Sequence, residues 1–364
     1  MNVTPVGAND TRLWGMSPRE RLARIAAVQG HALAEGGELL ANLDFVWDPA
    51  WLRFVAGRPH HVVTLGGVPA LAHCTDARDR ARVAEAMAGG RPIDDAAGLT
   101  LIPWEESDGI ANDELRKRER PFLGRIEPGT VRSLERASYF GAYKGVTDLL
   151  TKYLWPEWAL VLTRWAARAG ITPNQVTLAG AILCVAATIA FYHGWYWTGL
   201  AVGLGFMVLD TVDGKLARCT ITSSKWGEVF DHGIDLVHPP FWWYAWAVGL
   251  VAYGRPLEDT LFWAVLAVIV GGYVVQRLIE GVFIALFGMH IHVWRRFDSR
   301  FRLITARRNP NMVILLVFLA AGRPDWGLVA VAAWTLVSLL VHAVQLVQAM
   351  GGRARGRTIQ SWLA

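Results

Sequence analysis

Four aspartates carry the clearest chemistry in the sequence. They form two pairs, Asp210 with Asp213 and Asp231 with Asp235. Residues three or four apart share one face of an α-helix, so each pair would present two carboxylates together. Two helices packed on these faces would bring four negative charges to one point, which requires a cation among them. Ligation by oxygen alone favours magnesium, manganese or calcium over zinc, so the spacing predicts a site for such an ion.

Small residues flank these acids. Gly214 follows the first pair directly, Ala217 lies about one turn further on, and Gly227 lies about one turn before Asp231. Small side chains let a backbone or a ligand approach closely, so we expect a narrow slot beside the metal site. Four plain surface aspartates are the alternative, but ionisable groups next to membrane segments are costly and usually functional.

The acids lie where long apolar segments meet. Apolar residues make up 53% of the 364 residues and charged residues only 18%, and the apolar excess falls almost entirely after residue 170. A membrane-spanning helix needs about 20 apolar residues, and the pattern predicts six spans, of which the fifth is the shortest. Their expected ranges are 176–197, 199–213, 234–253, 261–287, 312–321 and 326–350.

Positive charges fall in alternate loops of this predicted bundle. The loops after the second and fourth spans and the segment after the sixth are rich in Lys and Arg, whereas the loops around His193, Gly254 and Arg323 have few. By the positive-inside rule, the N-terminus, the acids and the C-terminus all lie in the cytoplasm. We therefore expect a multi-pass protein of the inner or cell membrane with its active site on the cytoplasmic side.

The pattern of short apolar runs and charged segments over residues 1–130 predicts a small cytosolic α/β domain. This part of the sequence has no glycine-rich phosphate loop and no Ser/His/Asp or Cys/His arrangement. Three well-separated cysteines in the whole chain predict neither disulfides nor a zinc site, and charges throughout the first thirty residues argue against a cleavable signal. The expected elements are helices at 18–40 and 76–87, two short strands within 61–73 that turn at Gly66-Gly67, and a strand at 99–104.

Residues 131–170 connect this domain to the membrane part. Interspersed aromatic and charged residues over 139–155 are typical of an amphipathic helix at a membrane surface, with a plain linker helix as the alternative. A further helix is expected at 160–169. The membrane domain would then cover 171–352, and a basic cytosolic tail 353–364. The predicted fold is an all-α six-helix membrane bundle preceded by a small α/β domain.

The stretch from Asp210 to Asp235 resembles the signature of the CDP-alcohol phosphotransferases. It fits D-x2-D-G-x2-A-R-x8-G-x3-D-x3-D at every position, and the resemblance extends over about 171–350. It implies a six-helix membrane fold, usually dimeric, with two divalent cations, Mg2+ or Mn2+, at the cytoplasmic side. It also implies an enzyme of phospholipid or phosphodiester synthesis in which an acceptor hydroxyl displaces CMP from a CDP-alcohol, with no role for nucleic acid.

The resemblance assigns roles to the motif. It implies that all four aspartates bind metal and that Asp235 is also the general base for the acceptor hydroxyl, a role that suits a carboxylate among other carboxylates. Two bridging cations would neutralise a diphosphate and stabilise the departing CMP. Arg218 has a second interpretation as a structural partner of an acid. The residues expected beside the nucleotide are Gly214, Ala217, Arg218, Gly227, Asn174 and Thr177.

The acceptor is less defined. A polyol phosphate would require basic residues near the membrane surface, although each candidate is also explained by topology or headgroup charge. Arg277 and Glu280 are three residues apart in the fourth span, which predicts a buried ion pair or a polar cavity. His238, before Pro239-Pro240, is expected to serve packing, with ligation as the alternative. The acceptor candidates are Lys144, Lys152, Arg164, Arg277 and Arg302.

The front half is similar, more loosely, to proteins that fuse an inositol-phosphate cytidylyltransferase to a CDP-inositol phosphotransferase. The similarity rests on the junction from Gly145-Val-Thr-Asp148 to Asn174 after an α/β domain. The glycine- and arginine-rich loop that opens a nucleotidyltransferase domain is absent from the sequence. We therefore expect a shortened, inactive relative, a regulatory module or an unrelated domain, and assign it no catalysis.

Two other functions remain open. A membrane prenyltransferase also binds magnesium diphosphate through paired acids, but it would need another acidic motif well after Asp235, and the sequence has none. A cation-binding membrane protein without enzyme activity would show no dependence on nucleotides. Release of CMP from CDP-diacylglycerol or a CDP-polyol such as CDP-inositol separates these possibilities.

Overall fold

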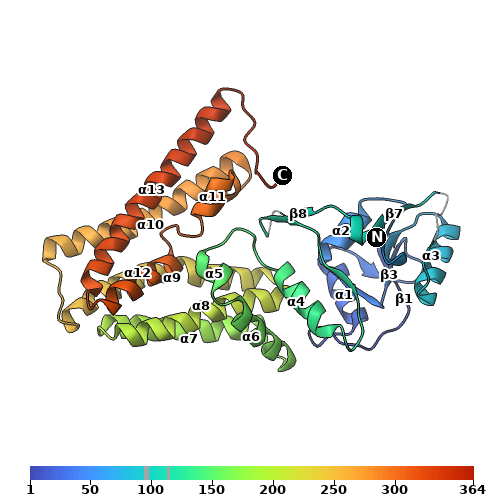
Figure 1. Cartoon of the computed structure of the whole chain (residues 1–364), viewed down its shortest axis with the longest axis horizontal. Helices are drawn as coiled ribbons and strands as arrows, with labels where there is room; N and C mark the ends of the chain where they lie inside the picture. Colours follow the sequence, from blue (N-terminus) through green and yellow to red (C-terminus); the bar gives the residue numbers. More distant parts are fainter. Residues whose placement is uncertain (94–97, 113–114) are drawn as a thin grey trace.

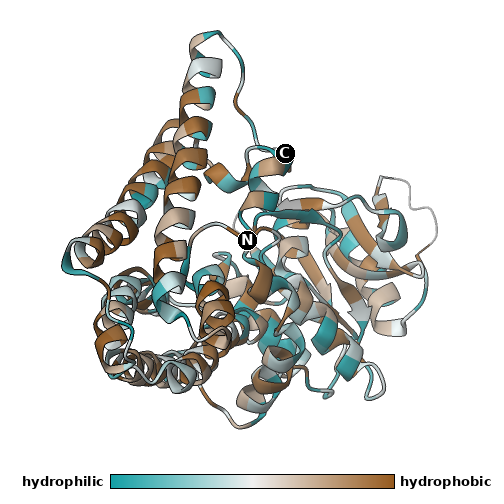
Figure 2. Ribbon diagram, turned by 60° about the vertical axis from the view of Figure 1, so that its left-hand side comes forward, coloured by the Kyte–Doolittle hydropathy of each residue, from teal (hydrophilic) through white to brown (hydrophobic). Residues whose placement is uncertain are grey.

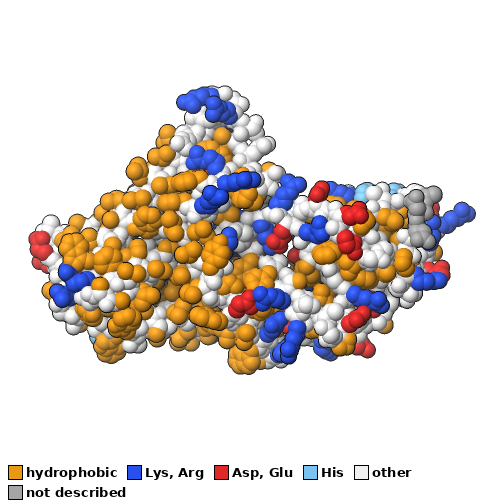
Figure 3. Space-filling view, viewed as in Figure 1, with side chains coloured by type: hydrophobic (Ala, Val, Ile, Leu, Met, Phe, Trp, Pro, Cys, Tyr) orange, Lys and Arg blue, Asp and Glu red, His pale blue; other side chains and the backbone are white. Residues whose placement is uncertain are grey.

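The computed structural model describes residues 1–93, 98–112 and 115–364. An α/β domain forms the N-terminal end of the molecule, and long helices form the remainder (Figure 1). Hydrophobic residues follow the long helices (Figure 2), and in the space-filling view they cover most of the helical part, while charged side chains gather over the α/β domain (Figure 3).

The α/β prediction is confirmed. Among the described residues, one sheet has the strand order β2-β1-β3-β6-β5-β7, with β6 antiparallel to both of its neighbours and the other pairs parallel. Strands β10 and β4, and strands β8 and β9, form two small antiparallel pairs. The elements are β1 Asn2–Val6, α1 Pro18–Val28, β2 Ala32–Leu33, β3 Leu39–Asn42, β4 Phe45–Trp47, α2 Pro49–Ala56, β5 His61–Leu65, β6 Val68–His73, α3 Ala77–Gly89, β7 Thr100–Pro103, η1 Trp104–Glu106, β8 Ile110–Asn112, β9 Lys117–Glu119 and β10 Leu123–Arg125.

Glycines explain where the local predictions hold and where they fail. The turn between β5 and β6 has Gly66 and Gly67 at φ 56° and 78°, as the predicted hairpin requires. The helix predicted over 18–40 is wrong beyond Val28. Gly30 and Gly36 adopt φ values of 75° and 74°, which an α-helix excludes, and the chain continues as β2 and β3.

The single helix predicted over 139–155 is also wrong. The chain forms α4 Val131–Gly141, a non-helical connection, and then the short helix α5 Leu149–Tyr153. The carboxylate of Asp148 accepts the backbone N–H groups of Leu150 and Thr151, so it starts a new helix there. Trp155 is fully buried and its indole N–H donates to Thr211, so this side chain packs inside the protein.

Helices continue to the C-terminus at the predicted apolar segments. Three of them, α7, α10 and α13, are long and apolar enough to cross a membrane. Helix α12 has 13 residues and is about 20 Å long, less than the roughly 30 Å of a hydrocarbon core. The helices are α6 Pro156–Arg168, α7 Pro173–Tyr192, α8 Tyr196–Cys219, α9 Lys225–Ala252, α10 Asp259–Phe287, η2 Ile291–Val293, α11 Arg296–Phe301, α12 Arg308–Ala320 and α13 Pro324–Ala354.

Close packing fixes α7, α8 and α9 relative to one another. A Cβ added to Gly249 in α9 would lie 1.9 Å from the carbonyl oxygen of Phe191, so the end of α7 touches the backbone of α9. The Tyr196 hydroxyl at the start of α8 donates to the carbonyl oxygen of Trp246 over 2.7 Å. These contacts hold in register the two helices that carry the acid pairs.

The α/β domain docks on the end of α8 that carries the motif. Arg21 in α1 is buried and donates to the carbonyl oxygen of Cys219 over 3.0 Å, and Arg24 donates to that of Thr220 over 2.8 Å. The last carbonyls of a helix lack partners within it, so these arginines cap α8. The position of the motif helix is therefore set partly by the N-terminal domain.

Candidate active site

A cavity of about 860 Å³ lies at the junction of the helices and the α/β domain. Residues from the ends of α7, α8, α9, α10 and α12 line it, together with the connection after α4 and the segment after β8. All four motif aspartates are among these residues. The four aspartates expected to converge from their spacing on two helices therefore line one shared cavity.

Three of the four aspartates come together. Asp210, Asp231 and Asp235 each offer a carboxylate oxygen within 4.8 Å of the others. Three oxygens at this separation suit a hard divalent cation such as Mg2+. Asp213 is not in this group, because its carboxylate is held elsewhere: the Thr177 hydroxyl donates to Oδ2 over 2.6 Å. Thr177, expected beside the nucleotide, thus contacts an acid.

Arg308 is a site residue that sequence reasoning did not single out. Its Nη1 donates to Asp235 Oδ1 over 2.7 Å, and its Nη2 donates to Asp210 Oδ2 over 2.8 Å. One guanidinium therefore supplies the positive charge that converging carboxylates require. The only sequence signal was its place in the Arg307-Arg308 pair before the fifth apolar segment, which was interpreted as a topology charge.

The residues predicted beside the nucleotide all line the cavity. A Cβ on Gly227 would lie 3.0 Å from Asn174 Oδ1, and a Cβ on Gly214 would lie 3.1 Å from Arg218 Nη2. Both glycines therefore border a narrow space, as expected. Within the described part of the chain, no carboxylate lies within ion-pair distance of Arg218, which argues against the structural interpretation of this residue.

Cationic side chains occupy another part of the cavity wall. Burial lowers the pKa of Lys144, and the nearby Arg116 and Arg218 lower it further. Burial likewise lowers the pKa of Arg302 to about 9, helped by Arg307. Such a concentration of positive charge suits an anion. The cations that line the cavity near one another form what we call the cationic wall: Arg116, Lys144, Arg277, Arg302 and Arg307.

Two acceptor candidates lie elsewhere. The Arg164 guanidinium donates to Glu135 over 2.8 Å, and Lys152 lies over the ring of Tyr153. Neither lines the cavity. His238 packs against an aromatic side chain: its ring contacts Phe206 edge-on, with centroids 5.0 Å apart.

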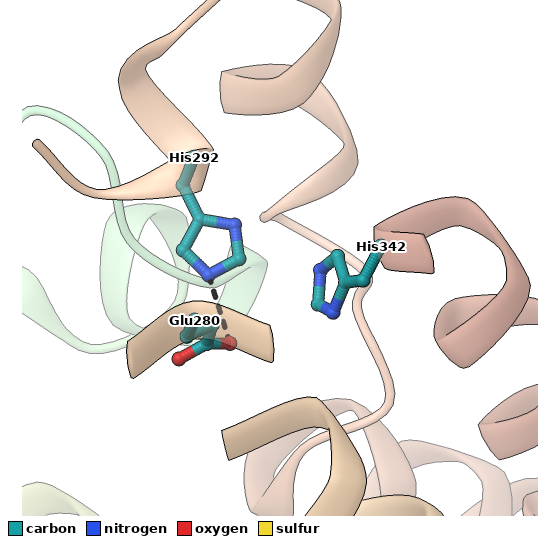
Figure 4. Close-up of side chains that lie close together, drawn as sticks. All are labelled: Glu280, His292 and His342. Carbon is teal, nitrogen blue, oxygen red and sulfur yellow. Dashed lines mark hydrogen bonds and ion pairs between the residues drawn. The ribbon is translucent and has the colours of Figure 1, made fainter. Parts of the chain in front are cut away.

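Glu280 lies beside His292 and His342 (Figure 4) and also binds Arg277 and Arg307. Its Oε1 accepts from Arg277 Nη2 at 2.8 Å and from Arg307 Nη2 at 2.5 Å, and lies 3.2 Å from His292 Nε2. The Arg277–Glu280 pair is thus an ion pair inside a polar cavity, which unites the two alternatives from the sequence. His342 in α13 faces the same point.

Glu280, His292 and His342 could also hold a metal ion by their spacing. However, Arg307 Nη2 lies 3.2 Å from His292 Nε2 as well as against Glu280. The guanidinium therefore occupies the position that an ion would share between them. We assign to these three residues the role of holding Arg277 and Arg307 in position.

Residues 170–344 match the family model described as CDP-alcohol phosphatidyltransferase. The chain is 33% identical over 130 residues to Cholinephosphotransferase 1 of Gallus gallus, covering 32% of this chain and 36% of that protein. It is 37% identical over 93 residues to Phosphatidylinositol phosphate synthase of Streptomyces avermitilis, covering 24% of this chain and 38% of that protein.

These alignments span little more than a third of the relatives' own lengths. The family match begins at residue 170, so it does not extend to the α/β domain. Within it lie both acid pairs, Arg308 and the Arg277–Glu280 pair. Residues 170–344 therefore form a domain of the CDP-alcohol phosphatidyltransferase family.

Proposed function

We propose that this protein is an integral-membrane, metal-dependent CDP-alcohol phosphotransferase. It transfers a substituted phosphate from a CDP-alcohol to an acceptor hydroxyl and releases CMP. The observation that carries the proposal is one cavity with a group of three carboxylates on α8 and α9 and a cluster of cations near α10 and α12. The family match over the same helices supports it.

The motif residues have different roles in this reaction. Asp210, Asp231 and Asp235 would hold a divalent cation, which neutralises diphosphate charge when bound. Asp213, which accepts a hydrogen bond from Thr177, would complete the ligand set. The side chain of Asp235 is 44% exposed, against 18% for Asp210 and 31% for Asp231, so it is the carboxylate most open to an incoming hydroxyl. It is the proposed general base.

The donor nucleotide would occupy the glycine-bordered slot. Gly214, Ala217 and Gly227 leave room for the cytidine and its phosphates, and Arg218 is the cation available to them. A CDP-alcohol and an acceptor would then meet at the carboxylates between the slot and the cationic wall. This arrangement requires in-line displacement of CMP, for which positioning of both reactants matters most.

The cationic wall favours a phosphorylated polyol as acceptor over a neutral lipid hydroxyl. Arg302 is buried, yet its Nε and Nη1 have no hydrogen-bond partner in the described part of the protein, and the Nε atoms of Arg277 and Arg307 also have none. Buried guanidinium donors without partners are costly, and a bound phosphate would satisfy them. The donor is then CDP-diacylglycerol or a CDP-polyol.

We further propose that α7, α8, α9, α10, α12 and α13 together span the membrane as six helices. Helices α8 and α9 are not among the three helices apolar enough to cross a membrane alone, yet both pack against α7, which is one of them. By the positive-inside rule, the basic loops favour a cytoplasmic position for the cavity and both termini of a protein in the inner or cell membrane. A homodimer and two ions per site are parts of this proposal drawn from the family.

The decisive experiment measures CMP release by the purified protein with Mg2+ from CDP-diacylglycerol and CDP-inositol, each against glycerol phosphate, inositol phosphate and lipid hydroxyls. Asp231→Asn should reduce release at least a hundredfold while the protein stays folded, because it removes one of the converging carboxylates. Asp259→Asn, at the first turn of α10 outside the cavity, is the matched control. Absence of CMP with every pair, from folded protein, would refute the enzyme and favour the cation-binding alternative.

A further inference from the structure

The α/β domain places one of its own residues in the cavity of the family domain. Arg116 immediately precedes β9, and its side chain lines the cavity. Its Nη2 is 3.2 Å from Nε2 of His290, in the segment after α10. A residue outside the family match therefore reaches the site that the family match contains.

The backbone at Arg116 is held in an unfavourable conformation. Its φ is 52°, in the left-handed region that residues with a Cβ rarely adopt. The connection after α4 clamps it there: the Gly145 N–H donates to the carbonyl oxygen of Leu115 over 2.8 Å, and a Cβ on Gly145 would lie 2.6 Å from the Arg116 carbonyl oxygen. Strained residues fixed by their surroundings are typical of functional sites.

In the described part of the chain, the cations on the cavity wall around Arg116 outnumber the carboxylates beside them, Glu280 and Asp148. Arg307, Lys144 and Arg302 line the same wall, and Glu280 already accepts from two arginines. The Nε of Arg116 is buried without a hydrogen-bond partner in the described residues. Burial lowers the pKa of Arg116, and the charge of Arg307 lowers it further. Several cations held this close need a multiply charged anion to offset their repulsion.

We propose that Arg116 binds the anionic group of the acceptor, so that the α/β domain completes the acceptor site of the phosphotransferase. This inference rests on the proposed function and specifies the acceptor as a phosphorylated alcohol. The domain thereby contributes to specificity without chemistry of its own. Its docking through Arg21 and Arg24 on the end of α8 sets the position from which Arg116 enters.

The test separates binding of an anion from turnover. The full-length protein is purified with Arg116→Gln, Arg116→Lys or Arg118→Gln. Arg118 lies two residues further along β9, is exposed and does not line the cavity, so it is the matched control. Gln and Lys keep a Cβ, so the backbone cost at position 116 does not change. Thermal midpoints are measured in EDTA with increasing inorganic phosphate or glycerol 3-phosphate, and separately with CMP and Mg2+.

We expect phosphate and glycerol 3-phosphate to raise the midpoint of the wild type. The concentration needed should increase about tenfold or more in Arg116→Gln, because one charged hydrogen-bond donor is lost. It should increase less in Arg116→Lys and not at all in Arg118→Gln. The CMP and Mg2+ response should be the same in all four proteins. In steady state, Arg116→Gln should raise the acceptor KM and leave the donor KM unchanged.

Two results would overturn this inference: no response of the wild type to either phosphate compound, or an unchanged response in Arg116→Gln. A merely structural role would instead lower the midpoint without ligand and weaken the CMP response equally. Failure of the wild type to respond to CMP with Mg2+ would refute the proposed function, while the phosphate titration would still decide whether Arg116 binds an anion.

Discussion

Arg308 lies against Asp235, with 2.7 Å between its Nη1 and the Oδ1 of the acid, and its Nη2 contacts Asp210 at 2.8 Å. A single side chain from α12 thus joins the two helices that carry the motif. Its guanidinium is 11% exposed and Asp210 18%, so their contact is largely shielded from water, whereas Asp235 is 44% exposed. Without a divalent cation, this arginine is the group that balances the carboxylates.

Arg308→Gln should therefore destabilise the metal-free protein more than the Mg2+-loaded protein. Removal of Arg308 leaves the part-buried carboxylate of Asp210 without its partner, which costs about 1–3 kcal/mol of unfolding free energy in EDTA, while the more exposed Asp235 adds little. Mg2+ should restore most of that loss, because it supplies positive charge to the same acids. Denaturant unfolding with and without Mg2+ measures both values.

Arg300→Gln is the control for this comparison. Arg300 lies in the same basic segment but is exposed and does not line the cavity. Its substitution should leave both unfolding free energies close to those of the wild type. An equal loss for Arg308→Gln in EDTA and in Mg2+ would contradict a charge-balancing role at the metal site.

Thr177→Val should lower the rate of CMP release about tenfold. The Thr177 hydroxyl donates to Asp213 over 2.6 Å, and a hydrogen bond to a charged group contributes about 1.5–3 kcal/mol. Valine keeps the shape but removes the donor, so the carboxylate loses its fixed orientation. Thr177→Ser should retain most of the activity, and kinetic assays of the two variants decide the matter.

A second threonine of α7 provides the control. The Thr188 hydroxyl donates to the carbonyl oxygen of Cys184 one turn earlier, away from the cavity. Thr188→Val should therefore have activity near that of the wild type. If Thr177→Val were as active as Thr188→Val, the orientation of Asp213 would not matter for the reaction.

The convergence of the acids could be predicted because it depends on local spacing. Asp231 and Asp235 share a helix face whatever the rest of the chain does, and the positions of the apolar segments set where the two acid-bearing helices meet. Arg308 could not be predicted in the same way. It is 73 residues from Asp235 and 98 from Asp210, and nothing in the sequence distinguishes it from the other arginines before the fifth segment.

The failed helix predictions have a common cause. Apolar and charged residues over 18–40 and 139–155 fit a helical period, but the period does not register backbone breaks. Gly30 and Gly36 take left-handed conformations, and Asp148 is better used as a helix cap than as a helical residue. The entry of Arg116 into the cavity was hidden for another reason, since domain docking leaves no local pattern.

Gly145→Ala should weaken acceptor binding although it removes no charge. The added Cβ would meet the carbonyl oxygen of Arg116 at 2.6 Å and the Cβ of Lys117 at 2.7 Å, so the Arg116 segment has to shift. Small displacements of a binding group have large effects on affinity, and we expect a severalfold higher acceptor KM with an unchanged donor KM. Steady-state kinetics with both substrates varied would show this.

Gly129→Ala is the matched control for this substitution. A Cβ at Gly129 meets nothing within 4 Å, and the residue precedes α4 outside the cavity. Its kinetic constants should equal those of the wild type. A Gly145→Ala protein with an unaltered acceptor KM would show that the exact placement of Arg116 is unimportant.

His290 should make the protein less stable in mildly acidic solution. It lies in the loop after α10, and its pKa is lowered to about 4. Burial is the largest cause, and the charge of Arg116 is the second. Glu280 opposes the shift, and Lys144 and Arg307 add to it. In the unfolded chain a histidine titrates near pH 6.5. Between these two values only the unfolded state binds the proton, so stability is full at pH 7 and falls as the pH falls toward 4.

His290→Gln cannot take up this proton, and its amide oxygen can still accept from Arg116. The thermal midpoint should therefore drop less between pH 7 and pH 5 in His290→Gln than in the wild type; an identical drop in both proteins would exclude His290 as a source of acid sensitivity.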